Sequence, residues 1–200
     1  MKRLVLGVAL VGLAIPTLAG NSKSEIVLAG KPHMEFECPA NTPLRLHVRS
    51  GEILIVGTDD TKVTVDLAGK NVDKIQDVKG RFLVAKNVAE FHLTGGPKDE
   101  LQIIIHVPKN LDLTAHVFAG DVSVHDVVGN KDLELKAGQL TIGVEKPEEY
   151  GDVDMSVNAG DLDAEMFGDS KSGLFRTVSR KGEGKYRLHA HVGTGQLSVR

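Results

Sequence analysis

Apolar and polar residues alternate along most of the chain, and the alternation changes phase at short Ala-Gly phrases. In LTAHVFAGDVSV, residues 113–124, apolar side chains occupy every second position up to Val117 and resume at Val122. Such alternation is typical of a β-strand with one buried face. Residues two apart share a face, so Val117 and Val122 would lie on opposite faces of a straight strand. Both reach one core only if the chain bends at Ala119-Gly120.

The same phrase occurs five times in one frame. Apolar residues precede a glycine by three and five positions, a small residue stands directly before it, and a polar then an apolar residue follow. The glycines of this repeat are Gly51, Gly120, Gly138, Gly160 and Gly195. Glycine tolerates the positive φ that a sharp corner requires, so we expect five structural corners. The 18 residues from the second glycine to the third, and 22 to the fourth, suit coils of about 20 residues.

This pattern predicts an all-β protein with one of two architectures. The repeat period favours a β-solenoid, a β-helix-like stack of short strands with glycine corners. The alternative is an antiparallel β-sandwich or meander in which each corner is a hairpin loop. Further strands are expected at KVTVDLAG, GRFLVA and LQIIIHVP, the last ended by Pro108. In GLFRTVSRKGEGKYRL we expect an extra pair of strands with a hairpin turn at residues 181–184.

The first residues have the features of a secretory signal peptide. Lys2 and Arg3 precede an apolar run over residues 4–19 that ends in the small-residue sequence TLA. The run is shorter than the roughly 20 residues that span a bilayer, and Pro16 interrupts it. We therefore predict three parts. Residues 1–19 are the signal peptide, residues 20–34 a flexible or first-strand segment, and residues 35–200 one repeat-containing β domain.

Composition and charge narrow the function classes. The 200 residues carry a formal net charge of −3, which becomes more negative when the two basic residues of the signal peptide are removed. An acidic chain argues against nucleic acid as the partner. No transmembrane segment is expected in the mature chain, which would be periplasmic or extracellular. Cys38 is the one cysteine, so it is predicted to be a buried small hydrophobe or a free thiol.

The repeat also resembles a known family. The stretches LRLHVRSGEILIVG, KVTVDL, IIIHVPKNLDLTAHVFAGDVSVHDVVGNKDLELKAGQLTIG and HVGTGQLSV are similar to the bacterial putative-adhesin domains, a group of exported envelope proteins. The shared pattern is a strand ending in V-P, a strand ending in A-G-D, a short V-x-G link and another strand ending in A-G. The resemblance covers roughly residues 35–200. It implies an elongated β-helix-like domain outside the cytoplasm that takes part in surface attachment or envelope organisation, without catalytic residues.

Histidines are the first candidates for chemistry. Three of them lie four residues before a repeat glycine, on the outward face: His47, His116 and His191. Stacked coils would bring equivalent positions about 4.8 Å apart. Other copies of the repeat have Glu134 and Ser156 there, so the histidine-bearing strands need not be neighbours. His189 shares a face with His191, but a zinc site requires three or four convergent ligands. We therefore expect solvated surface histidines and no metal site.

Carboxylates at the corners are the second candidates. Asp121 and Asp161 each follow a repeat glycine, and paired carboxylates can do acid–base work at separations of about 5 to 9.5 Å. Gln139 would lie between them in the stack, and aspartate at a corner commonly bonds its own backbone. A turn-forming role is therefore expected. An enzyme would require these two residues to converge with Asp163 and Glu165.

Basic residues gather after Gly168, where Asp169 and Glu183 are the only acidic ones. The candidate surface-binding residues are Lys171, Arg176, Arg180, Lys181, Lys185 and Arg187. They could contact an anionic polysaccharide or lipid headgroups. They could equally guard an exposed terminal edge against pairing with another chain.

Together these features predict an exported, non-enzymatic structural or adhesive domain of the bacterial cell envelope. It would bind a surface glycan or protein through a rigid stacked β face, with no catalytic residue, cofactor or metal. One alternative is a periplasmic sensing or scaffold domain that binds another envelope protein, for example by strand addition. Another is a polysaccharide-processing enzyme built on a β-helix.

Overall fold

The computed structural model describes residues 24–39, 41–69, 75–96 and 101–200, and this part of the chain is built almost wholly of β-strands. The predicted all-β class is confirmed. The predicted signal peptide, residues 1–19, lies outside the described residues. Among the residues described, no helix has both the length and the apolar character needed to cross a membrane.

Within the described ranges there are twelve strands and two single-turn 3-10 helices. The strands are β1 (Ser24–Ala29), β2 (His33–Glu37), β3 (Leu44–Thr58), β4 (Lys62–Gly69), β5 (Lys79–Ala85), β6 (Val88–Thr94), β7 (Leu101–Pro108), β8 (Leu113–His125), β9 (Lys131–Ile142), β10 (Tyr150–Ala164), β11 (Asp169–Lys181) and β12 (Tyr186–Val199). The 3-10 helices are η1 (Pro147–Glu149) and η2 (Glu165–Phe167). The strands expected at KVTVDLAG, GRFLVA and LQIIIHVP are β4, β5 and β7.

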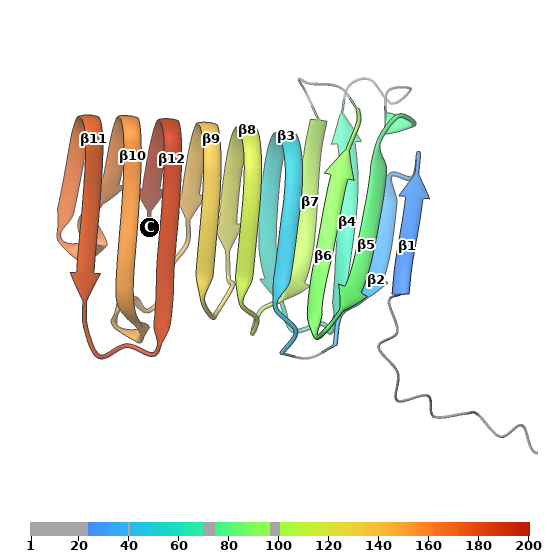
Figure 1. Cartoon of the computed structure of the whole chain (residues 1–200), viewed down its shortest axis with the longest axis horizontal. Helices are drawn as coiled ribbons and strands as arrows, with labels where there is room; N and C mark the ends of the chain where they lie inside the picture. The colour runs from blue at the N-terminus through green and yellow to red at the C-terminus, as the bar shows by residue number, and fades with distance from the viewer. Residues whose placement is uncertain (1–23, 40, 70–74, 97–100) are drawn as a thin grey trace, which may run out of the picture.

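Five long strands form the centre of the molecule and stand side by side in the order β3, β8, β9, β12, β10 (Figure 1). They are parallel, and each runs along one side of the molecule, over an apex and back along the other side. The register places the repeat glycines opposite one another at the apex, in the order Gly51, Gly120, Gly138, Gly195 and Gly160. Residues before the glycines thus form a front layer, and residues after them form a back layer.

The hydrophobic core lies between the two layers. Val117, before the bend of β8, is 5% exposed, and Val122, after the bend, is 3% exposed. Both belong to one continuous cluster of buried side chains that also contains Cys38. The bend therefore brings both phases of the alternation into a single core, as the shift of phase predicts. Full burial of an aliphatic side chain contributes about 1.5–3 kcal/mol, so this arrangement supplies much of the stability.

Antiparallel strands complete both ends of the stack. At one end, β6 and β7 pair in parallel with the front and back parts of β3. Antiparallel strands then follow, with β5 and β1 extending the front layer and β4 and β2 extending the back layer. At the other end, β11 pairs with β10 through both layers. The structure thus has the stacked parallel strands of the predicted solenoid. It also has the facing layers and antiparallel edges of the alternative.

The prediction of a hairpin turn at residues 181–184 is wrong. Strand β12 does not pair with β11 but lies between β9 and β10, parallel to both. The link to β12 passes the start of β10, where the Gly182 amide donates a hydrogen bond to the Gly151 carbonyl. The reason is that β12 carries the complete repeat phrase. Its buried Leu188 and Val192 and its corner Gly195 match β9 and β10 in register, and a local hairpin offers no such match.

The apex requires glycine for two reasons. Gly138 has φ +131°, a conformation that side chains rarely adopt. A Cβ atom added to Gly138 would also lie 1.9 Å from the carbonyl oxygen of Gly120 on the neighbouring strand. The bent backbones approach each other so closely that no side chain fits between them.

Replacing Gly138 by alanine tests this close approach, and Gly168→Ala is the matched control. Gly168 has φ +95°, but a Cβ added there meets nothing within 4 Å. Its replacement should cost only the backbone strain of about 1–2 kcal/mol. The clash makes Gly138→Ala cost more than about 4 kcal/mol. Urea denaturation of both variants measures these free energies of unfolding, and equal costs would show that backbone conformation alone requires the glycine.

A lysine is buried in the front layer. The inward position seven residues before the repeat glycine holds an aliphatic residue in other strands, such as Leu113 in β8, but Lys131 in β9. Lys131 is 0% exposed, and its ammonium donates a hydrogen bond to the Tyr150 hydroxyl and lies 4.5 Å from the centre of that ring. Burial lowers the pKa of Lys131 to about 8 and raises the pKa of Tyr150 to about 12.

This lysine makes stability depend on pH. Between about pH 8 and pH 10 the unfolded chain still holds the proton that Lys131 has lost in the folded protein, so the free energy of unfolding rises with pH. Lys131→Met should remove this rise and be more stable at pH 7 by about 1–4 kcal/mol, because a buried charge is replaced by an apolar side chain. Denaturation of both proteins across this range checks it. Parallel pH curves would mean that Lys131 titrates at its ordinary pKa.

Candidate functional site

The outer surface of the front layer carries rows of polar side chains that cross the strands. Because the strands are in register, residues four positions before the repeat glycines become neighbours. From β6 to β10 this row reads His92, His47, His116, Glu134, His191 and Ser156. The first three members, His92, His47 and His116, are adjacent, and we name them the histidine row.

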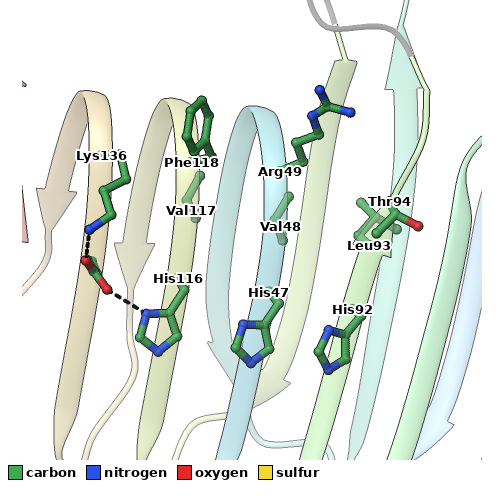
Figure 2. Close-up of a pocket in the computed structure, with 11 residues that line it drawn as sticks. His47, Val48, Arg49, His92, Leu93, Thr94, His116, Val117, Phe118 and Lys136 are labelled. Atoms are coloured by element: carbon green, nitrogen blue, oxygen red, sulfur yellow. Dashed lines mark hydrogen bonds and ion pairs between the residues drawn. The ribbon is translucent and has the colours of Figure 1, made fainter.

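The imidazole rings of the histidine row stack on one another (Figure 2). The ring centres of His47 and His92 are 4.5 Å apart with 13° between the planes, and those of His47 and His116 are 5.2 Å apart with 12°. Ring nitrogens of parallel planes point side by side and do not converge on one point. Within the described ranges, no group of three or more His, Cys, Asp or Glu side chains is placed to hold a metal ion.

Glu134 closes the row at the β9 end. Its carboxylate lies 3.0 Å from Nδ1 of His116 and also accepts a hydrogen bond from the Lys136 ammonium (Figure 2). The hydrogen bonds from Lys136 and His116 lower the pKa of Glu134. Glu134 is therefore ionised at neutral pH, and Lys136 balances its charge.

The pKa of His47 lies below its ordinary value. Its partial burial lowers the pKa of His47, and positive charge on His92 and His116 lowers it further. Glu90 acts in the opposite direction, whereas Arg45 adds to the lowering. Two unit charges 4 Å apart repel by about 1 kcal/mol in water and about 4 kcal/mol near a protein surface. The three rings therefore resist being charged together.

A shallow groove of about 310 Å³ runs beside the histidine row. Its other wall comes from side chains two residues before the repeat glycines, namely Arg49, Phe118 and Lys136, together with Thr94 of β6. Phe118 is 67% exposed and lies on the strand between those of Arg49 and Lys136 (Figure 2). We name this the histidine groove. An exposed aromatic ring with cations on both sides suits binding of a ligand more than chemical conversion.

The histidine groove was only partly predictable. His47 and His116 were expected on the outward face, and the structure makes them direct neighbours because β3 pairs with β8. His191 is separated from His116 by Glu134. His92 was missed, although it stands four residues before Gly96 with buried Phe91 and Leu93 around it, which is the frame of the repeat.

His189 and His191 both lie on β12, but their rings contact side chains of different neighbouring strands. Nδ1 of His189 lies 2.8 Å from the Asp132 carboxylate of β9, and Nδ1 of His191 lies 2.8 Å from the Ser156 hydroxyl of β10. The two rings share a face but interact with partners on opposite sides of β12. Their arrangement is that of surface residues in cross-strand pairs.

The corner carboxylates do not come together. Asp121 and Asp161 are separated in the stack by two glutamines, Gln139 as expected and also Gln196. Three strand spacings amount to about 14 Å, beyond the range of a carboxylate pair. Gln196 donates a hydrogen bond to Asp161 at 3.4 Å. Asp163 lies two residues further along β10, and Glu165 is in η2, so the four acidic residues are spread over separate positions.

Four of the predicted basic residues lie on the edge strand β11. Lys171, Arg176 and Arg180 pair with residues of β10 whose side chains are buried, so they face the end of the core between the layers. The Lys171 ammonium lies 2.7 Å from the Asp169 carboxylate and donates a hydrogen bond to the Thr177 carbonyl. Inward-pointing charges of this kind protect a sheet edge from pairing with another chain.

The other three basic residues lie at the end of β11 and around the start of β12. Lys181, at the end of β11, forms an ion pair of 2.5 Å with Asp152. Lys185 precedes β12 and stands 4.4 Å from the centre of the Tyr186 ring, and Arg187 follows within β12. Lys181 and Arg187 are both register partners of Asp152, on opposite sides of β10.

A larger cavity, of about 540 Å³, is lined by loops that connect the back layer to the front layer, such as residues 126–128 and 143–146. It is lined by several charged residues that pair with one another. Lys109 pairs with Asp59, and Lys146 lies 3.7 Å from Glu149. The histidine groove is the better candidate because its aromatic ring and Arg49 are open to a ligand.

No family model matches the chain, and no curated protein matches it. The fold, however, is known. A solved structure described as a putative cell adhesion protein from Clostridium sporogenes matches with a TM-score of 0.51 and 11% identity, over 89% of this chain and 99% of that one. A putative adhesin from Parabacteroides merdae matches with a TM-score of 0.26 and 11% identity, over 64% and 65%.

At this identity the first likeness shows a shared fold. That fold occurs in the Clostridium sporogenes protein described as a putative cell adhesion protein.

The charge coupling in the histidine row can be measured directly. His92→Gln removes one neighbouring positive charge and some of the surroundings of His47, so the pKa of His47 should rise toward its ordinary value. An NMR titration of the histidine ring signals gives this pKa. His191→Gln, on the same row but beyond Glu134, is the control and should leave it unchanged. An unchanged pKa in His92→Gln would show that the rings do not interact.

Proposed function

We propose that this chain is an exported, non-enzymatic adhesion module whose front face binds a glycan or protein of the bacterial cell envelope. Residues 1–19 serve as the signal peptide, residues 20–34 form a first-strand segment that contains β1, and residues 35–200 form one repeat-containing β domain. The module works in the periplasm or at the cell surface. The observation that carries the proposal is the histidine groove, with its exposed Phe118 between Arg49 and Lys136.

Two further features support this function. The front face is rigid, because its rows are fixed by in-register parallel pairing of five strands. A rigid face loses little conformational entropy when it binds, which favours affinity. The fold is shared with a structure described as a putative cell adhesion protein.

The alternatives receive less support from the described residues. A scaffold that recruits a partner by strand addition needs an exposed and unprotected edge strand. At β11 the inward charges of Lys171, Arg176 and Arg180 oppose this, and we propose that they guard the edge. A polysaccharide-processing enzyme needs converging carboxylates, and Asp121 and Asp161 lie three strand spacings apart, too far for a carboxylate pair.

Phe118→Ala tests the proposed binding face, and Phe175→Ala is the matched control. Phe175 is 80% exposed on the edge strand β11, away from the groove. Central aromatic residues of binding sites commonly contribute about 2 kcal/mol or more, so Phe118→Ala should weaken binding roughly 30-fold. Co-sedimentation with insoluble envelope polysaccharide, and with purified envelope proteins, measures this.

Neither substitution touches the core, so both variants should keep the native circular dichroism. The unaltered protein must bind for the comparison to count. If both variants then lose binding equally, or if neither loses it, the binding surface lies elsewhere. No binding to any envelope component would overturn the proposed function itself.

A further inference from the structure

The histidine row is surrounded by a defined set of charges. On β3 these are Arg45 and Arg49, on β6 His92 and Glu90, on β8 His116, and on β9 Glu134 and Lys136. Arg45 lies 3.4 Å from Glu90, and Lys136 pairs with Glu134. Among the described residues this leaves Arg49 as the cation without a carboxylate partner. With the three imidazoles uncharged, the groove thus has one net positive charge, within a chain that is acidic overall.

Protonation would change this charge greatly. If all three rings were protonated, the groove would carry four net positive charges. The rings oppose this because they stack at 4.5 and 5.2 Å, where like charges repel strongly. An anion placed over the row removes this penalty, since it attracts each imidazolium. Binding of an anion and uptake of protons must then favour each other reciprocally.

The shape of the groove indicates the kind of anion. It is shallow and open and crosses the strands, so equivalent side chains repeat about every 4.8 Å along it. This repeat is comparable to the length of one sugar unit in an extended polysaccharide. Phe118 offers a flat apolar surface on which the face of a sugar ring can stack, and the histidine row and Arg49 can meet carboxylates carried by successive sugars.

Ring nitrogens are available for this purpose. Within the part of the chain that the structure describes, neither nitrogen of His47 forms a hydrogen bond. His116 is oriented by Glu134, through Nδ1 at 3.0 Å. A protonated imidazole donates from both nitrogens, so the row can supply donors to a carboxylate as well as charge.

We infer that the histidine groove binds an acidic polysaccharide bearing a carboxylate on each sugar and takes up protons as it does so. This inference rests on the proposed binding function of the same face. Binding strengthens as the surroundings become mildly acidic and weakens at neutral pH.

Isothermal titration calorimetry of the protein with polygalacturonate tests this inference at about pH 5.5 and about pH 7.5. Measurements in two buffers with different heats of ionisation give the number of protons taken up. Fully methyl-esterified polygalacturonate is the matched ligand, because it has the same backbone without charge. For each proton taken up, the binding constant should rise about tenfold when the pH falls by one unit. The methyl ester should bind weakly at both pH values.

His47→Gln should lose most of the proton uptake and of the pH dependence. The control is His125→Gln, a histidine of the back layer, which should retain both. His47 is partly exposed on the outer face, so the native circular dichroism should be kept. His92→Gln provides a second variant with the same expected direction.

The outcomes separate this inference from the proposed function. Polygalacturonate binding without proton uptake, or with the full pH dependence kept in His47→Gln, overturns the inference and leaves the adhesion function standing. A preference for the methyl ester, or for an envelope protein, overturns the ligand class. Failure of the adhesion function is read from the co-sedimentation experiment instead, where no envelope component would bind.

Discussion

Everything in this structure depends on how closely neighbouring backbones approach one another at the apex. An added Cβ atom at Gly138 or Gly195 would lie less than 2 Å from a carbonyl oxygen of the next strand. Contact this close fixes the relative height of the strands, because a slip by one residue would bring a side chain into the same space. The core follows from this constraint. With the bends aligned, the inward aliphatic side chains of the front layer face those of the back layer and form one core.

The same alignment builds the candidate site. Polar side chains at one distance from the bend become neighbours on the outer surface, whatever their separation in the chain. His47 and His92 are 45 residues apart in sequence, yet their rings stack at 4.5 Å. The repeat thus converts single surface residues into rows of equal spacing. A linear ligand with its own repeat can match such rows, and for this reason the groove is a stronger candidate than any single cluster of charges.

The repeat glycines and the phase of the alternation made the buried positions, most strands and the outward histidines predictable. The order of the strands was not, because β12 enters between β9 and β10 and nothing local to the sequence signals that choice. His92 escaped notice because its copy of the phrase breaks after Gly96, before β7 restores the pairing with β3. Lys131 occupies an aliphatic position of the repeat. Only the nearby Tyr150 hydroxyl, brought in by tertiary structure, explains how its charge is tolerated.

The position of β12 has a consequence for assembly. Strands β10 and β11 precede it in the chain but have no parallel connection to β9 until β12 is inserted. The order of the strands in the stack therefore departs from their order in the chain, because the last strand lies between two earlier ones. The pairings of β12 join residues 57 and 35 positions apart in the chain, such as Leu188 with Lys131 and with Val153, and non-local pairing of this kind slows folding.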